Sequence, residues 1–142
     1  MGLAGGYGGA LGQLWCFPAG TKVTMGDGVP KNIEAIRAGE MVMTENGEPA
    51  EVITAMEPHK NIVYVFNTEN GMQLRTTLSQ PVREENGAWI DAGDIVPGET
   101  RLKGAGLIIS KRGDGTQRVY DLHVGGDNTY IADGFIVKGG DW

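Results

Sequence analysis

The pair Asn-Gly occurs three times in this chain, each time between two short runs of strand-forming residues. Such a pair is a strong signal for a tight β-hairpin, because both residues tolerate the positive φ of the turn. Together with further Gly-Asp-Gly and Asp-Gly turns, these pairs predict an all-β domain. The expected strands are 21–25, 40–44, 50–58, 61–68, 72–77, 88–90, 107–111, 118–124, 129–132 and 135–137, with one helical turn within 30–36.

A repeated motif indicates that the domain contains two related halves. Residues 36–42 read Ile-Arg-Ala-Gly-Glu-Met-Val, and residues 90–96 read Ile-Asp-Ala-Gly-Asp-Ile-Val. Val63-Tyr64 is likewise answered by Val119-Tyr120. Two matches in order, at offsets of 54 and 56 residues, predict a duplicated β-unit with pseudo-twofold symmetry.

Composition limits the partners that we expect. Lys and Arg total 12 against 18 Asp and Glu, a net charge of −6, which argues against a nucleic-acid or acidic-membrane surface. No apolar run approaches the length of a membrane-spanning helix, about 18 residues. One cysteine and two histidines exclude an internal disulfide and leave too few ligands for a structural zinc site. We therefore expect one domain, a monomer, with no metal and no cofactor.

The single cysteine, Cys16, stands at the boundary between two kinds of sequence. Residues 1–14 include six glycines, which predict a flexible flank because such a stretch loses too much backbone entropy on folding. Alternatively, Leu11, Leu14 and Trp15 dock as an extra edge strand. A thiol at such a boundary can attack the Trp15–Cys16 peptide bond; the alternative is a small buried apolar side chain. The expected divisions are a flank at 1–15, a domain at 16–139 and a second flank at 140–142.

Four segments resemble the Hint domain that inteins, bacterial intein-like domains and hedgehog autoprocessing domains share. They cover nearly the whole chain from Cys16 to Val137, and they occur in the family's order. The segments are 16–23 with 28–40, 74–82, 89–99, and 119–124 with 129–137. The resemblance implies a horseshoe-shaped, all-β Hint fold, and it is nearest to a bacterial intein-like domain without the terminal His-Asn pair.

The same resemblance implies a set of catalytic residues. In the family the opening Cys attacks the preceding carbonyl in an N-to-S acyl shift, which gives a thioester. A Thr and a His hold the scissile amide, and an Asp assists the thiol. By position these residues are Cys16, Thr77 and Asp121, with Gln80 in the place of the His. Gln can hydrogen-bond the Trp15 carbonyl or the amide nitrogen, but it exchanges no proton near neutral pH, which typically costs about 10²–10⁴ in rate.

His123 is a further candidate for the missing acid or base. It follows Asp121 by two residues, and residues i and i+2 of a strand share a face, so it can reach the site that Asp121 lines. The alternative is that His123 points to solvent or pairs locally with Asp121. Asp121 itself is alternatively a carboxylate at a turn or at a strand end.

The C-terminal end departs from the splicing members of the family, which end in His-Asn followed by Ser, Thr or Cys. Here the matching residues are Lys138, Gly139 and Gly140. Gly139 has no side-chain amide that could cyclise, and Gly140 has no nucleophile. The sequence therefore predicts no splicing and no C-terminal cleavage. Asn128 lies too early to replace the terminal Asn and is interpreted as a turn residue.

Two functions are consistent with these residues. The first is a self-cleaving, single-turnover domain whose substrate is its own N-terminal flank and whose acyl acceptor is water, a thiol or an amine. The second is a Hint fold that has lost catalysis and acts as a structural or interaction module of a larger protein. A thiol peptidase acting on other proteins is less consistent, since such enzymes need a Cys–His pair and a substrate cleft.

Overall fold

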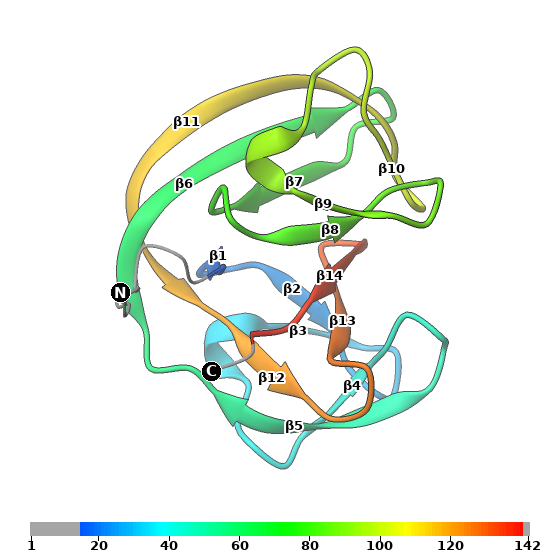
Figure 1. Ribbon diagram of the computed structural model, residues 1–142. Coiled ribbons are helices and arrows are strands. Elements are labelled where there is room, and N and C mark those ends of the chain that lie inside the picture. Colours follow the sequence, from blue (N-terminus) through cyan, green and yellow to red (C-terminus); the bar gives the residue numbers. More distant parts are fainter. Residues whose placement is uncertain (1–14, 141–142) are drawn as a thin grey trace, which may run out of the picture.

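The computed structural model describes residues 15–140 (Figure 1). The flank expected at 1–14, including the alternative edge strand, lies outside the described residues. The elements in chain order are β1 (Phe17–Pro18), β2 (Lys22–Thr24), β3 (Pro30–Asn32), η2 (Ile33–Ala35), β4 (Met41–Met43), β5 (Pro49–Ala55), β6 (His59–Thr68), β7 (Gln73–Thr76), β8 (Pro81–Arg83), β9 (Trp89–Asp91), η3 (Ala92–Asp94), β10 (Arg101–Leu102), β11 (Gly106–Tyr120), β12 (Leu122–Val124), β13 (Thr129–Ala132) and β14 (Phe135–Lys138).

The strands form three sheets, and the predicted all-β fold is confirmed. One sheet has the order β1-β11-β6-β7, with β10 paired to β11. A second has the order β12-β5-β4, and the third the order β3-β2-β13-β14-β8-β9. The long strands β6 and β11 pair antiparallel and curve along one side of the molecule (Figure 1). The third sheet crosses between the two halves, so they share one core.

The three Asn-Gly pairs lie in turns between consecutive strands, as predicted. They join β4 to β5, β6 to β7 and β8 to β9. Their glycines, Gly47, Gly71 and Gly87, have φ values of 82°, 87° and 91°, which residues with a side chain rarely adopt. The turn at Asp133-Gly134 likewise joins β13 to β14.

The Gly113-Asp114-Gly115 segment was predicted to be a turn, and this prediction is wrong. β11 continues through it from Gly106 to Tyr120, because β6 supplies hydrogen-bonding partners on both sides of the segment. The register shifts between Gly113 and Thr116, so the glycines accommodate an irregularity within a long curved strand. β11 ends just before Asp121, which leaves this residue between two strands.

The duplication predicted from the sequence is present. β2, β3 and η2 follow the same course as β8, β9 and η3. In the first unit the Ile33 N–H donates to the Thr21 carbonyl over 2.9 Å. In the second the Ala92 N–H donates to the Gln80 carbonyl over 2.8 Å. Equivalent residues are therefore 59 positions apart.

The predicted register of this repeat is wrong. The sequence match pairs Ile36 with Ile90, whereas Ile36 corresponds to Ile95: each donates its N–H to the carbonyl three residues earlier, over 3.3 Å and 3.2 Å. The match between Ala38-Gly39-Glu40 and Ala92-Gly93-Asp94 gave the wrong register, because Gly93 lies inside η3. Gly98, with φ 86°, is the counterpart of Gly39, with φ 94°.

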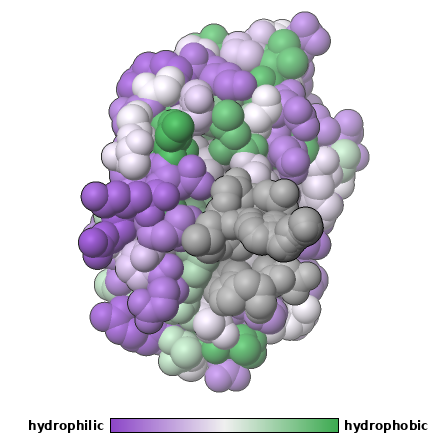
Figure 2. Space-filling view, turned by 60° about the vertical axis from the view of Figure 1, so that its left-hand side comes forward, coloured by the Kyte–Doolittle hydropathy of each residue, from purple (hydrophilic) through white to green (hydrophobic). Residues whose placement is uncertain are grey.

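The main core draws on both halves of the molecule. Phe17 and Tyr130 lie at its centre, fully buried, and their rings meet edge to face with centroids 6.1 Å apart. A smaller cluster contains Cys16, Val63 and Val119, with Met56 packed against it. Much of the face in Figure 2 is polar, with separate apolar patches. None of the helices within 15–140 is long and apolar enough to cross a membrane.

Candidate active site

Cys16 is held at the start of β1, where the chain enters the core. Phe17 pairs with Tyr120 at the end of β11, which draws the preceding residue inside. The Cys16 side chain is fully buried among Val63, Val119 and Met56. The surroundings of Cys16 therefore fit the alternative of a small buried apolar side chain. Its polar contacts determine which chemistry the thiol can take part in.

Thr76, the last residue of β7, and Thr77, which follows it, form hydrogen bonds with the peptide groups on both sides of Cys16. The Cys16 N–H, which belongs to the Trp15–Cys16 bond, donates to Thr77 Oγ1 over 3.0 Å. The Cys16 carbonyl accepts from Thr76 Oγ1 over 3.0 Å and from the Thr77 N–H over 3.1 Å. Thr77 was among the predicted residues, whereas Thr76 was missed. The adjacent Thr-Thr pair was the available signal.

Asp121 lies between β11 and β12, and 2% of its surface is exposed. Its Oδ1 accepts hydrogen bonds from the Tyr130 hydroxyl over 2.6 Å and from the Leu122 N–H over 2.8 Å. Burial raises the pKa of the Asp121 carboxyl well above its usual value, and the hydrogen bonds from Tyr130, Leu122 and Gly140 oppose this rise. Tyr130 was not predicted, because its role depends on β13 passing beside Asp121.

The Cys16 thiol is held in its protonated form. Burial raises the pKa of Cys16, and the nearby negative charge of Asp121 raises it further. Burial and the Asp121 charge also raise the pKa of the Tyr130 hydroxyl. The Cys16 thiol and two acids with raised pKa values, Asp121 and Tyr130, therefore lie together in a region from which water is largely excluded.

Gln80 is fully buried, but its side chain does not contact the Trp15–Cys16 bond in the way that the sequence suggested. Its Nε2 donates to the Pro81 carbonyl over 2.8 Å and to the Lys138 carbonyl over 3.0 Å, which uses both amide hydrogens. The proposed donation to the Trp15 carbonyl or to the amide nitrogen is therefore not made. Oε1 of Gln80 is buried without a hydrogen-bond partner among residues 15–140.

His123 lies on β12, half-buried, opposite Thr54 of β5. Lys138, at the position of the family's penultimate His, directs its ammonium group to the Trp89 ring, 5.7 Å from the centroid. It therefore extends over an aromatic side chain of β9. Within residues 15–140, no group of three or more His, Cys, Asp and Glu side chains is arranged to hold a metal ion.

The Asn128 side chain forms hydrogen bonds with the residues that follow β14, and the sequence did not predict this contact. We call it the Asn128 clamp. Asn128 has φ 58°, as its interpretation as a turn residue predicts. Its side chain also accepts from the Val124 N–H over 2.8 Å and donates to the Gly139 and Gly140 carbonyls, each over 3.0 Å. A Cβ atom on Gly139 would overlap Asn128 Oδ1 and lie 2.7 Å from the Leu122 carbonyl oxygen. No side chain therefore fits at position 139 in this arrangement.

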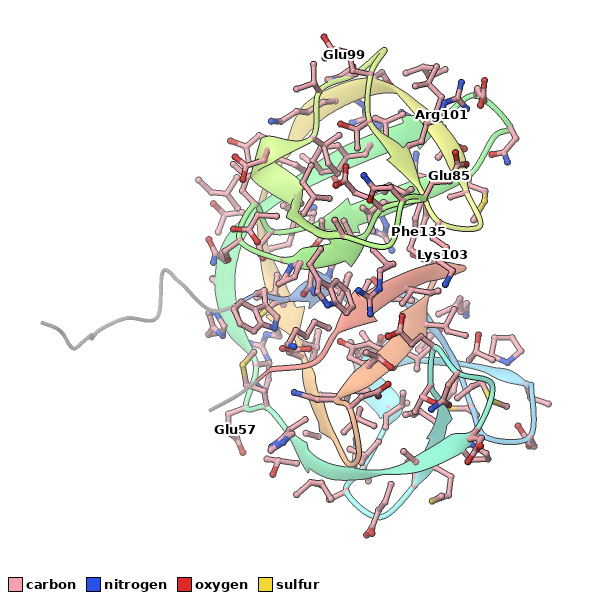
Figure 3. The ribbon with its side chains drawn as sticks, turned by 45° about the vertical axis from the view of Figure 1, so that its right-hand side comes forward. Glu57, Glu85, Glu99, Arg101, Lys103 and Phe135 are labelled. Atoms are coloured by element: carbon pink, nitrogen blue, oxygen red, sulfur yellow. The ribbon has the colours of Figure 1, made fainter. Side chains whose placement is uncertain are left out.

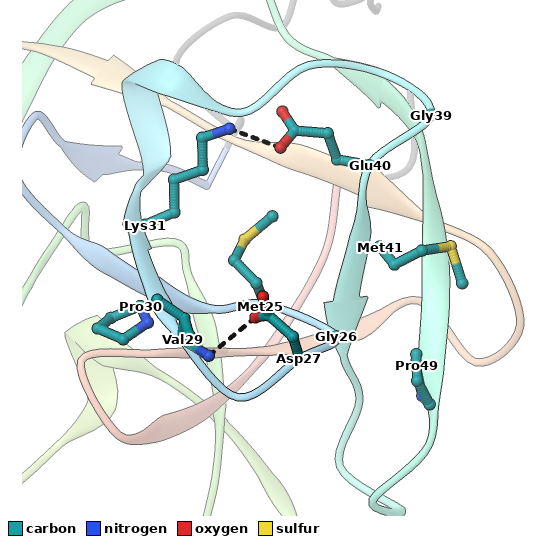
Figure 4. Close-up of a pocket in the computed structure, with 10 residues that line it drawn as sticks. All are labelled: Met25, Gly26, Asp27, Val29, Pro30, Lys31, Gly39, Glu40, Met41 and Pro49. Carbon is teal, nitrogen blue, oxygen red and sulfur yellow. Dashed lines mark hydrogen bonds and ion pairs between the residues drawn. The ribbon is translucent and has the colours of Figure 1, made fainter.

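Two surface hollows differ in their relation to the site. A hollow of about 320 Å³ borders Asp121 and is lined by Ile33, Ile36, Met56, Tyr120 and Leu122 among others. Glu57, labelled in Figure 3, also lines it. A larger hollow of about 750 Å³ is lined by the β2–β3 turn and by residues 39–41, and the ion pair of Lys31 and Glu40, 2.6 Å long, lies at its edge (Figure 4). Neither Cys16 nor Asp121 lines this larger hollow.

Comparisons with known proteins agree with this geometry. The family model described as Hom_end-associated Hint matches residues 16–81. The catalytic subunit of the V-type proton ATPase of Candida tropicalis is 50% identical over 38 residues, which are 27% of this chain and 4% of that protein. The chain thus corresponds to a small part of that relative's length.

Crystal structures of inteins match most of the chain. The DnaB intein from Synechocystis sp. PCC 6803 superposes with a TM-score of 0.78 and 19% identity, covering 89% of this chain and 99% of the intein. The gp41-1 intein superposes with a TM-score of 0.77 and 17% identity, covering 87% and 98%. The chain therefore has the intein-like Hint fold, and residues 16–81 match a Hint family model. This fold supports an autoprocessing or splicing-type domain.

Proposed function

We propose that this chain is a single-turnover autoprocessing domain in which Cys16 attacks the Trp15–Cys16 peptide bond. The observation that carries the proposal is the hold on Cys16. Thr77 fixes the N–H of the scissile bond, Thr76 and Thr77 fix the following carbonyl, and Asp121 lies close enough to affect the thiol electrostatically. A hydroxyl beside the Cys16 nitrogen and a carboxyl beside the sulfur are the groups that transfer of the Trp15 acyl group would use.

In the first step the Cys16 thiol loses its proton to the Asp121 carboxylate, and the sulfur attacks the Trp15 carbonyl carbon. The C–S bond forms and the C–N bond breaks. The nitrogen of Cys16 takes up the proton that Asp121 accepted from the thiol and becomes a free amine. The Thr77 hydroxyl supports this change, because it accepts from the amide N–H and can donate to the amine lone pair once the bond has broken.

In the second step an acceptor cleaves the thioester. Water, a thiol or an amine attacks the Trp15 carbonyl, the C–S bond breaks, and the proton of the acceptor restores the Cys16 thiol. The products are residues 1–15 as an acid, thioester or amide, and a domain that begins with Cys16. Gly139 and Gly140 supply neither an Asn side chain nor a nucleophile, so the proposal includes neither splicing nor C-terminal cleavage.

The first step is expected to be slow. The raised pKa of Cys16 keeps the thiolate population small at neutral pH. Gln80 has no proton to give, and both its N–H groups are engaged elsewhere. A slow acyl shift that an added nucleophile draws forward is consistent with both features.

The alternative is a Hint fold that serves as a structural or interaction module. It is favoured by the clamp of Asn128 on Gly139 and Gly140, which ties the C-terminal strand at the place where splicing inteins cut. It is also favoured by Lys138, whose side chain lies over Trp89.

Intact-mass measurement separates the two functions. The full chain is incubated with and without hydroxylamine or dithiothreitol, beside a Cys16→Ala variant. Loss of residues 1–15 in the Cys16 protein alone is the expected result. No change of mass over several days at pH 8 would sink the autoprocessing function and leave the structural module.

A further inference from the structure

Three successive carbonyl groups at the end of β14 are each held by a side-chain carboxamide. Gln80 donates to the Lys138 carbonyl over 3.0 Å. Asn128 donates to the carbonyls of Gly139 and Gly140, also over 3.0 Å. These three hydrogen bonds fix the backbone of residues 138–140. We call this fixed segment the seat.

The seat lies against Asp121, which is next to Cys16. Phe17 pairs antiparallel with Tyr120, so the preceding Cys16 and the following Asp121 come together. Met56, which packs against Cys16, donates its N–H to the Asp121 carbonyl over 3.0 Å. The Gly140 N–H donates to the Leu122 carbonyl over 2.9 Å, next to Asp121, and its hydrogen bonding also lowers the pKa of the Asp121 carboxyl. Gly139 and Gly140 are both buried. The absence of side chains lets the backbone approach closely, since a Cβ on Gly139 would overlap Asn128 Oδ1. Residues 138–140 thus form part of the wall that keeps water from Asp121.

Asn128 is the residue best placed to set this seat. Its Oδ1 accepts from the Val124 N–H at the end of β12, and its Nδ2 donates to two carbonyls of the C-terminal segment. One side chain therefore ties together the strand that follows Asp121 and the segment that covers it. Its backbone adds a further link, because the Asn128 carbonyl accepts from the Gly139 N–H over 2.7 Å.

We propose that Asn128 is a positioning residue that seats residues 138–140 against Asp121, so that the reactivity of the Cys16 thiol depends on this seat. The proposal rests on the proposed function in one respect, the role of Cys16 as nucleophile. Without the Asn128 side chain, two buried carbonyls and one N–H lose their partners, and water replaces the segment over Asp121. Water and small electrophiles then reach the space beside Asp121, next to Cys16, and the thiol reacts faster with electrophiles.

Alkylation of Cys16 by iodoacetamide in the full chain tests this inference without depending on the acyl shift. The main variant is Asn128→Gly, because glycine keeps the positive φ of residue 128 and removes only the side chain. We expect alkylation to become faster by about tenfold or more, since losing three hydrogen bonds shifts a local opening equilibrium by at least this factor.

Two control variants distinguish a loosened seat from a general loss of stability. Asn46→Gly removes a carboxamide that accepts from the Thr44 hydroxyl and the Glu48 N–H in the β4–β5 turn. Ile95→Val weakens the core beside η3. Both should leave the alkylation rate within about twofold of the original at matched loss of stability in urea. Equal acceleration in Asn128→Gly and in the controls would overturn the inference.

A second variant approaches the seat from its other side. Gly139→Ala places a methyl group against Asn128 Oδ1 and should also accelerate alkylation if the seat protects the thiol. An unchanged rate in both folded variants would refute the role of Asn128, even where hydroxylamine still releases residues 1–15. Conversely, faster alkylation with no release of residues 1–15 from any variant would support the seat and count against the proposed function.

Discussion

The hydroxyl of Tyr130 donates a 2.6 Å hydrogen bond to Oδ1 of Asp121, and both side chains are almost completely buried. A hydrogen bond to a buried carboxylate is worth more than one between neutral groups. We therefore expect Tyr130→Phe to lower the free energy of unfolding by about 1.5–3 kcal/mol at pH 8. The loss should shrink in acid, where Asp121 is protonated. Urea denaturation over a pH series from 4 to 9 measures this loss, and an equal loss throughout the series would contradict the assignment.

Asp121 should make the protein less stable as the pH rises. Its folded-state pKa is raised above the value of about 3.9 in the unfolded chain, so the folded state binds the proton more tightly. The favourable contribution of the protonated form is present in full below about pH 4 and is lost as the pH rises through the folded-state pKa.

Asp121→Asn should remove this dependence. The amide keeps an oxygen that can accept from Tyr130 or Leu122, and it carries no charge to desolvate. We expect a flatter profile of unfolding free energy between pH 4 and pH 8, together with a loss of cleavage of about 10²–10⁴ if Asp121 is the base. Parallel urea titrations and intact-mass kinetics give the two results. A variant that cleaves at the original rate would exclude Asp121 from proton transfer.

The two threonines should differ in importance. Thr77→Val leaves the buried Cys16 N–H without an acceptor, at a cost of about 1–3 kcal/mol, and removes the hydroxyl beside the scissile nitrogen. Thr76→Val leaves the Cys16 carbonyl with its bond from the Thr77 N–H and should cost less. We expect release of residues 1–15 to be nearly lost in Thr77→Val and only reduced in Thr76→Val. The reverse order would show that the hydrogen bond from Thr76 to the Cys16 carbonyl matters more for cleavage than the one from the Cys16 N–H to Thr77.

Gln80→His should restore a group that can exchange a proton at the position of the family's His. We expect hydroxylamine-dependent release of residues 1–15 to accelerate by about 10²–10⁴. A neutral imidazole has one N–H, whereas Gln80 donates to both Pro81 and Lys138, so the melting temperature should fall slightly. Gln80→Ala, which loses both bonds and gains no acid, serves as the control. Acceleration in both variants would point to loosening of the C-terminal strand instead.

The rate of cleavage should follow the ionisation of Asp121, because this carboxylate takes the thiol proton in the proposed first step. Burial raises the pKa of Asp121, so the rate of hydroxylamine-dependent release should rise with pH while Asp121 ionises and then level off. Rates from intact mass at half-unit intervals measure this profile. A rate that still rises about tenfold per pH unit at pH 9 would mean that free Cys16 thiolate starts the reaction without Asp121.

Local turn chemistry explains why most of the fold could be predicted. The Asn-Gly turns at Gly47, Gly71 and Gly87 need the conformation that these residues favour, so they form wherever strands flank them. The Gly113-Asp114-Gly115 segment carries similar letters but lies inside β11, because pairing with β6 outweighs the local preference. The register of the duplication was misread for a related reason, since hydrogen bonds at a spacing of 59 residues define it, and short matching motifs do not.

The sequence by itself determined an all-β fold with two related halves, and its resemblance to Hint domains singled out Cys16, Thr77, Gln80 and Asp121. Only the tertiary structure decided which groups these residues contact. Thr76 meets the Cys16 carbonyl across a separation of 60 residues, and Gln80 binds the Lys138 carbonyl across 58. Asn128 reaches Gly139 and Gly140 across a β-hairpin. Hydrogen bonding of a buried polar side chain depends on distances of a few tenths of an ångström, which strand register and packing set after distant segments have come together.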